Sequence, residues 1–118
     1  MYKLRTKHRL YCSHYLKDHD GKCRNLHGHE YYIILEIHKK ELNDINMVYD
    51  THKINLIFNA YVLTDHINLN EFLNVDNPTM EIMAKIFYDD LKEGIPELYS
   101  VTVQETPEAR VIYIDEEE

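Results

Sequence analysis

Alternating apolar and polar positions predict β-strands in four parts of the chain. The clearest is residues 30–40, which are rich in β-branched and aromatic residues. Every second position there is apolar and so shares one face: Tyr31, Ile33, Leu35 and Ile37. The other face begins with Tyr32 and Ile34, which indicates that this end of the strand is covered on both sides, by helices or by another subunit. Residues 2–12, 98–106 and 110–114 are the other predicted strands.

Two segments have the three- and four-residue spacing of amphipathic helices. The first begins at Asp50 or Thr51, either of which is a good N-cap, and extends to about Tyr61. Its apolar face is Ile54, Ile57, Phe58, Tyr61 and Val62. The second opens at Asn77-Pro78-Thr79 and stops at Gly94-Ile95-Pro96. Its stripe is Ile82, Met83, Ile86, Phe87 and Leu91, and residues 63–75 between the two helices are predicted to be irregular.

The order strand, strand, helix, helix, strand, strand predicts an α+β fold. Two helices would lie on one face of a four-stranded antiparallel sheet. Such a sheet has two unpaired edges, and closure with the sheets of other subunits removes them. With no repeat or linker, residues 1–118 are expected to form a single domain, with residues 115–118 as an acidic tail.

The charge is unevenly distributed along the chain. The net charge is −8, but residues 1–24 contain seven Lys and Arg against two Asp. A basic region in an acidic protein suits a small anionic substrate, although a chance surface cluster explains it equally well. The basic stretch is too short, and the overall charge has the wrong sign, for a nucleic-acid partner.

Composition also bears on the cellular location. No apolar run approaches the roughly 20 residues of a membrane span, and no apolar signal segment follows the basic start. Cys12 and Cys23 are too few for a disulfide framework, which fits a reducing compartment. We therefore expect a cytoplasmic protein without a membrane partner.

The stretch from Cys23 to His29 contains a candidate metal site. His27 and His29 are two residues apart, so on a strand they share a face, and His14 lies upstream in the apolar run 10–16. Three imidazoles with an open fourth position are typical of a catalytic zinc site. The alternative is three unrelated histidines, and the combined pattern favours the metal.

Three other groups are candidates for chemistry. Cys23 is either a small inert residue or, because Lys22 and Arg24 favour its thiolate, a base or nucleophile. Asp65 and His66 are an adjacent acid and imidazole, which on their own fit an ordinary polar surface. Glu105 ends an apolar strand and can accept hydrogen bonds from an amine or guanidine-like edge, unless it is simply a solvated strand end.

The combined motifs resemble the 6-pyruvoyl-tetrahydropterin synthase family from about residue 8 to residue 113. They are His14, Cys23-x-x-x-His27-Gly28-His29, Asp65-His66 with Leu69-Asn70, Pro78-Thr79-x-Glu81 and Glu105-Thr106. They are similar in particular to its bacterial branch, the 6-carboxy-tetrahydropterin synthases of queuosine biosynthesis. The resemblance implies the tunnelling fold, with the order ββααββ and both helices between the second and third strands. In that family three subunits close their sheets into a β-barrel and two trimers form a homohexamer, with active sites at subunit interfaces.

The resemblance also implies roles for the candidate residues. Zn²⁺ would be held by His14, His27 and His29. Cys23 would be the base, Asp65 and His66 would complete a relay, and Glu105 would anchor the pterin ring near Thr79 and Glu81. The substrate would be 7,8-dihydroneopterin triphosphate, and the product 6-carboxy-5,6,7,8-tetrahydropterin, with release of acetaldehyde and triphosphate. The basic first quarter of the chain would meet the phosphates.

Spacing and departures from the family pattern refine this expectation. Three residues separate Cys23 from His27, as in the carboxy-forming branch, whereas animal-type pyruvoyl synthases have a longer insert. Cys12 stands where alanine is common and shares a face with His14, so it could lie near the metal. Thr51 stands where phenylalanine is usual. The alternatives are a pyruvoyl-type synthase, a folate-pathway homologue that cleaves the side chain, and a non-catalytic metal-binding protein.

Overall fold

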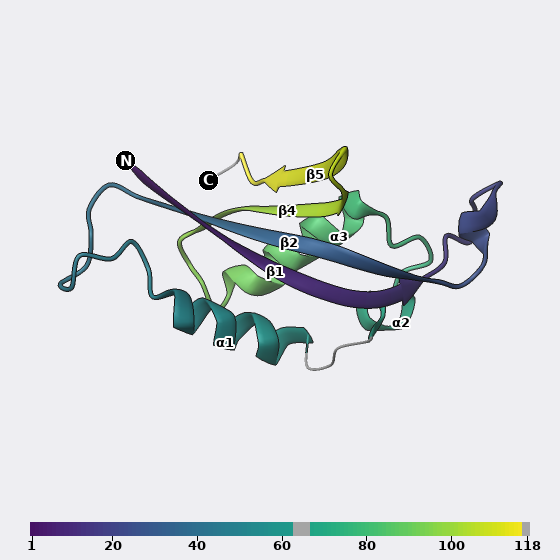
Figure 1. Cartoon of the computed structure of the whole chain (residues 1–118), viewed down its shortest axis with the longest axis horizontal. Helices are drawn as coiled ribbons and strands as arrows, with labels where there is room; N and C mark the ends of the chain where they lie inside the picture. Colours follow the sequence, from purple (N-terminus) through teal and green to yellow (C-terminus); the bar gives the residue numbers. More distant parts are fainter. Residues whose placement is uncertain (63–66, 117–118) are drawn as a thin grey trace.

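The structure is a computed structural model, and it describes residues 1–62 and 67–116, without the side chains of His27 and His29. Five strands form one mixed sheet in the order β3-β1-β2-β4-β5 (Figure 1). The strands are β1 (Tyr2–His14), β2 (His27–Lys39), β3 (Ile67–Asn68), β4 (Leu98–Thr106) and β5 (Ala109–Ile114). The helices are α1 (Thr51–Val62), α2 (Leu69–Leu73) and α3 (Met80–Lys92), with a short 3₁₀ helix, η1, at Lys22–Arg24.

The predicted α+β class is confirmed, but the prediction of a four-stranded, fully antiparallel sheet is wrong. β3 adds a fifth strand, which pairs in parallel with β1 at Cys12 and Ser13. β3 and α2 lie in the segment predicted to be irregular, where two- and five-residue elements are too short to show a periodic pattern. The local signal was capping: the Asn68 side chain accepts from Glu71 N–H at 3.3 Å, and Asn74 ends α2 in the left-handed conformation with φ 56°.

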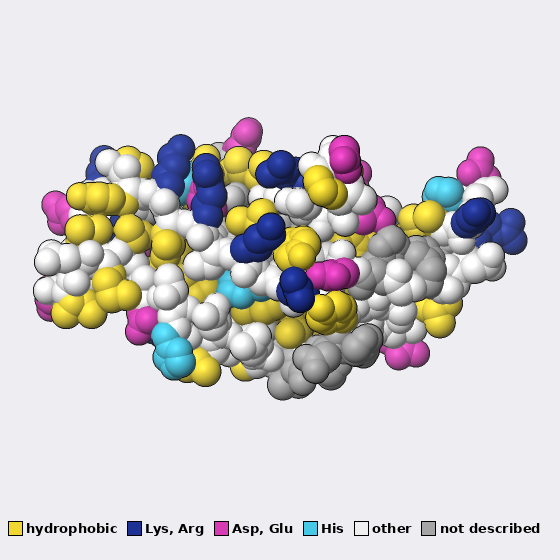
Figure 2. Space-filling model, in the orientation of Figure 1, with side chains coloured by type: hydrophobic (Ala, Val, Ile, Leu, Met, Phe, Trp, Pro, Cys, Tyr) yellow, Lys and Arg dark blue, Asp and Glu magenta, His cyan; other side chains and the backbone are white. Residues whose placement is uncertain are grey.

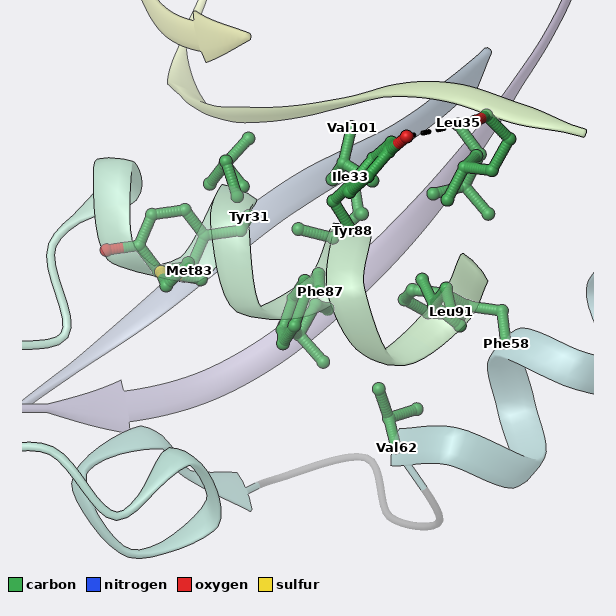
Figure 3. Packing of buried hydrophobic residues seen from close by; sticks show 14 of the residues in the cluster. Tyr31, Ile33, Leu35, Phe58, Val62, Met83, Phe87, Tyr88, Leu91 and Val101 are labelled. Atoms are coloured by element: carbon green, nitrogen blue, oxygen red, sulfur yellow. Dashed lines mark hydrogen bonds between the residues drawn. The ribbon is translucent and has the colours of Figure 1, made fainter. Parts of the chain in front are cut away.

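One face of the sheet carries the core. The predicted inward residues of β2 are all buried: Tyr31, Ile33, Leu35 and Ile37. Figure 3 shows side chains of α3 packed among those of β2, β4 and α1. The prediction that Ile82 belongs to the buried stripe is wrong, because its side chain is 38% exposed. The buried face of α3 instead turns toward Ala84 and Tyr88, and the Tyr88 hydroxyl donates to the Leu98 carbonyl at 3.4 Å.

The opposite face of the sheet is covered by no helix in the described part of the chain. We call it the open face. It carries basic side chains of β1 at every second position, and Figure 2 shows Lys and Arg side chains in a row along this strand. Lys7 Nζ lies 4.2 Å from the centre of the Tyr32 ring, and Arg9 Nε is 2.8 Å from the Glu30 carboxylate. Tyr32 and Ile34 are only half-buried, so within one chain the predicted cover on both sides of β2 is missing.

No helix in residues 1–62 and 67–116 combines the length and the apolar character needed to cross a membrane.

His8 lies under α1 and gives the fold a testable dependence on pH. Its ring stacks on Phe58, with centroids 4.6 Å apart, and its Nε2 is 2.9 Å from the Thr6 hydroxyl. Burial lowers the pKa of His8 below its ordinary value of 6.5, because desolvation disfavours the imidazolium ion.

We expect the stability of the protein to fall as pH drops below about 6.5, where the unfolded chain binds the His8 proton before the folded chain does. This histidine contributes a slope of up to about 1.4 kcal/mol per pH unit until pH passes below its folded pKa. The free energy of unfolding, measured by urea titration between pH 5 and 7.5, should lose this slope in His8→Gln. His52→Gln, an exposed histidine on α1, is the control. Equal slopes in the wild type and His8→Gln would contradict the assignment.

Candidate active site

A cavity of about 200 Å³ gathers most of the predicted site residues. It lies where the C-terminal end of β1 meets the loop before β2, the start of α3 and the end of β4. Five predicted residues line it: His14, Cys23, Thr79, Glu81 and Glu105. A larger cavity of about 320 Å³ on the open face is lined by Arg5, Glu36 and Arg110, among others, and by none of the predicted residues. The chemistry therefore points to the smaller cavity.

His14 is held in one orientation at the wall of this cavity. It is 4% exposed, and its Nδ1 lies 3.1 Å from the Pro78 carbonyl oxygen. A carbonyl oxygen only accepts, so Nδ1 carries the proton and Nε2 carries the lone pair. The Tyr31 hydroxyl lies 3.4 Å from Nε2 and can donate to it. The lone pair of His14 is therefore on Nε2, the nitrogen that faces Tyr31, and Nε2 is the atom that would coordinate a metal ion.

The pairing of β1 with β2 places the three histidine positions together. His14 is directly opposite His27, and Cys12 is directly opposite His29. Opposite residues of an antiparallel pair share a face, so positions 14, 27 and 29 occupy two neighbouring rows on the helix-covered face. Among the side chains that the structure describes, no three His, Cys, Asp or Glu groups are arranged to hold a metal ion. A three-imidazole site thus depends on His27 and His29, and the register fits one.

Cys23 is brought to the cavity by the loop between β1 and β2. It is the middle residue of η1, is half-buried and forms no disulfide. Its carbonyl oxygen accepts a 2.6 Å hydrogen bond from Leu16 N–H, which ties the loop to the segment after His14. Cys23 and His14 therefore line the same cavity from two different segments of the chain.

Thr79 and Glu81 lie at the start of α3. The Thr79 side chain caps the helix by accepting from Ile82 N–H at 3.4 Å, and Glu81 is exposed in the first turn. The Thr79 hydroxyl oxygen thus already accepts one hydrogen bond from the helix backbone.

Tyr31 is a site residue that the sequence reasoning missed. It is 1% exposed, lines the cavity and contacts His14 edge-on with ring centroids 5.9 Å apart. Burial raises its pKa, and the neighbouring Glu105 carboxylate raises it further, so the phenol keeps its proton. The signal was its spacing: Tyr31 follows His29 by two residues and so continues the histidine row into the core.

Comparisons with known proteins identify the family of the chain. A family model described as 6-pyruvoyl tetrahydropterin synthase matches residues 3–116. The chain belongs to this family. It is 36% identical to 6-carboxy-5,6,7,8-tetrahydropterin synthase of Synechocystis sp., over 80% of this chain and 78% of the relative. It is 25% identical to the Bacillus subtilis protein of the same name, over 95% of this chain and 84% of the relative.

The fold is also similar to a solved structure of the 6-pyruvoyl tetrahydropterin synthase family. The structure of Caenorhabditis elegans 6-pyruvoyl tetrahydropterin synthase superimposes with a TM-score of 0.84 at 28% identity. The match covers 97% of this chain and 95% of the worm protein. The family resemblance expected from the motifs is thus confirmed.

Cys12, a departure from the family pattern, is a core residue. It is 4% exposed, and desolvation raises its pKa to about 12, so its thiol stays protonated near neutral pH. Cys12 is not among the described residues that line the cavity.

The remaining predicted residues are placed as follows. Asp65 and His66 lie outside the described residues. Six of the seven basic residues of the first quarter fall into two groups, and the seventh, Lys17, lies between β1 and η1. The basic residues at odd positions of β1 lie on the open face, which is the other side of the sheet from His14. Lys22 and Arg24 flank Cys23 in η1. Within one chain, the second group is the one near the cavity.

The two cysteines should react at very different rates with a thiol reagent such as iodoacetamide. Cys23 is half-buried, whereas Cys12 is buried and, with a pKa of about 12, has roughly one part in ten thousand as thiolate at pH 8. We expect one fast modification that Cys23→Ala removes, and a second that requires urea and that Cys12→Ala removes. Mass spectrometry of the labelled peptides gives both rates. Fast labelling of Cys12 in the folded protein would contradict its burial.

Proposed function

We propose that this chain is a zinc-dependent 6-carboxy-tetrahydropterin synthase that acts on 7,8-dihydroneopterin triphosphate in queuosine biosynthesis. Its family makes it a pterin-processing lyase. The observation that carries the finer proposal is the cavity that holds His14, Cys23 and Glu105 together, opposite the His-x-His positions of β2.

The metal would be bound by His14, His27 and His29. A zinc ion held there would act as a Lewis acid and would make the C–H bond next to the substrate's side-chain hydroxyls more acidic. The hydrogen bond from His14 Nδ1 to the Pro78 carbonyl leaves the lone pair on Nε2, the atom that would coordinate the metal.

Cys23 would act as the base. Its thiolate removes the proton from the substrate side chain, with Asp65 and His66 completing the relay, and triphosphate leaves with the electron pair of the broken C–O bond. Proton shifts within the substrate then reduce the pterin ring, water supplies the carboxyl oxygen, and two carbons leave as acetaldehyde. No external reductant is needed, since the side chain is oxidised as the ring is reduced.

The pterin ring would be recognised from the other side of the cavity. Glu105 is half-buried there and would accept hydrogen bonds from the amine and ring N–H of the pterin, with Thr79 and Glu81 beside it. The Tyr31 phenol keeps its proton, so it would act as a fixed hydrogen-bond donor and not as a second base.

The chain would function as a single tunnelling-fold domain assembled into a cytoplasmic homohexamer of two trimers. On its outer side, β1 pairs within the described chain only at Cys12 and Ser13, and β5 is the other edge of the sheet. Barrel closure between subunits would pair these edges and enclose the open face.

Turnover of 7,8-dihydroneopterin triphosphate by the purified protein should yield 6-carboxy-tetrahydropterin and one acetaldehyde per triphosphate. Mass spectrometry identifies the pterin, and a coupled alcohol dehydrogenase assay measures acetaldehyde. Cys23→Ala should lower kcat by at least about 100-fold, as expected for loss of a general base, whereas Cys12→Ala should retain most of the activity. Full turnover by Cys23→Ala would exclude it as the base. A pyruvoyl product without acetaldehyde would support a pyruvoyl-type synthase, which the similarity to the worm enzyme makes the second candidate.

Removal of the metal should abolish turnover and be reversible. Dialysis against a chelator should leave an inactive protein, and one equivalent of Zn²⁺ per chain should restore its activity. His14→Ala should bind zinc at least about tenfold more weakly than the wild type, since it loses one of three ligands. His19→Ala, an exposed histidine in the loop before η1, is the matched control. Unchanged activity after complete metal removal would contradict zinc dependence.

A further inference from the structure

We infer that Asn70 is a positioning residue for His14, acting through the Pro78 carbonyl oxygen. The inference rests on the proposed zinc site, and nothing in the family comparisons assigns such a role. Asn70 is in α2, is buried and does not line the cavity. It therefore has to act on the site through its neighbours.

The Asn70 side-chain amide joins two segments that are far apart in the sequence. Its Oδ1 accepts from Tyr15 N–H at 2.9 Å, and its Nδ2 donates to the Tyr15 carbonyl at 2.9 Å. The same Nδ2 lies 3.1 Å from the Asp76 carbonyl and 3.4 Å from the Val75 carbonyl. One buried amide thus holds the end of β1 against the segment that leads into α3.

These two segments carry the two ends of the His14 hydrogen bond. Tyr15 directly follows His14, and Asp76 precedes Pro78 by two residues. Because Asn70 fixes both, it sets the distance between the His14 ring and the Pro78 carbonyl, observed as 3.1 Å. Burial of the amide excludes water, so its hydrogen bonds are not readily exchanged.

A second pair of side-chain bonds joins the same segments nearer the surface. Asp18 N–H donates to Asn77 Oδ1 at 3.2 Å, and Asn77 Nδ2 donates to the Asp18 carboxylate at 2.9 Å. Both residues are more exposed than Asn70, so this pair should contribute less to the position of His14.

The hydrogen bond from Nδ1 determines what His14 can do. It fixes the tautomer, keeps the ring orientation and directs Nε2 toward the cavity. Outer partners of this kind typically change metal affinity by about 10- to 100-fold when they are lost. Loss of the Asn70 ties should free the Pro78 carbonyl to move and leave His14 with either tautomer.

The test is the affinity of the whole protein for Zn²⁺, measured by competition with a chromophoric chelator at a temperature where circular dichroism shows each variant folded. We expect Asn70→Ala and Asn70→Asp to bind zinc about 10- to 100-fold more weakly than the wild type. Asp retains the acceptor for Tyr15 N–H but loses the donors, so a comparable loss in both variants assigns the effect to the donor ties. Asn77→Ala should lose less than about threefold.

Leu91→Ala is the matched control for a purely structural effect. Leu91 is a buried core residue of α3 that does not line the cavity, so this variant should lower the melting temperature but keep wild-type zinc affinity. Equal zinc affinity in the wild type and both Asn70 variants would overturn this inference but not the proposed metal site. Equal losses of zinc affinity in Leu91→Ala and Asn70→Ala would have the same consequence. A wild-type protein that binds no zinc would overturn the proposed metal site and the inference with it.

The tautomer of His14 provides a measurement that needs no variant. In ¹⁵N-labelled wild-type protein, long-range ¹H–¹⁵N correlation should show His14 with its proton on Nδ1, both before and after zinc is added. A proton on Nε2 in the metal-free protein would overturn the inference even if the Asn70 variants failed to fold.

Discussion

The pairing of β1 with β2 is the constraint on which the rest of the structure depends. The two strands pair from Tyr2 opposite Lys39 to His14 opposite His27 without a shift in register. A slip by one residue would turn every side chain of one strand to the other face. It would place Ile33 and Leu35 in the open face and separate His14 from the positions of His27 and His29. The apolar core and the candidate metal site are therefore specified by the same register.

Two histidines of β1 show how neighbours, not burial, decide the role of an imidazole. His8 and His14 lie on the same strand and the same face, and both are buried. His8 meets the Phe58 ring and the Thr6 hydroxyl, an environment that favours a neutral ring with no access to a ligand. His14 meets a carbonyl on one side and a cavity on the other. The physical basis of the difference lies outside β1: α1 packs over His8, and the loop before α3 packs over His14.

The sequence predicted those parts of the fold that have a long repeating pattern. Residues 30–40 and 98–106 alternate clearly, and β2 and β4 lie within a few residues of the predicted bounds. Residues 67–73 escaped prediction because β3, with two residues, and α2, with five, are too short for their periodic patterns to repeat. Ile82 was misplaced because a helix with a broad apolar surface has several stripes of similar strength, and only packing on β4 and β5 selects one.

The part of the candidate site that depends on the spacing of nearby residues was predictable from the sequence. The His-x-His pair and Cys23 come from one continuous stretch. His14 was a candidate from its place in an apolar run and Glu105 from its place at the end of a predicted strand, and the family motifs then gave them roles. Tyr31 and Asn70 were not predicted as site residues, because their importance depends on which distant segments they touch. A tyrosine in an apolar run and an asparagine after a short strand have no unusual local pattern. Their roles appear only when the ends of β1, β4 and α2 meet.

The two faces of the sheet differ in their cover: helices pack on one face, and among the described residues none packs on the other. The helix-covered face carries the core, whereas on the open face Lys7 lies over Tyr32 and Arg9 beside Glu30, and no layer covers them within residues 1–62 and 67–116. These ion and cation–π pairs satisfy part of the charge. On β5, at the other edge of the same face, Ile112 and Ile114 are exposed. A sheet with one covered face, one open face and a β1 edge that pairs with described residues only at Cys12 and Ser13 is poorly suited to remain alone. The proposed barrel would meet both needs at once, since pairing of the β1 and β5 edges between subunits also encloses the open face.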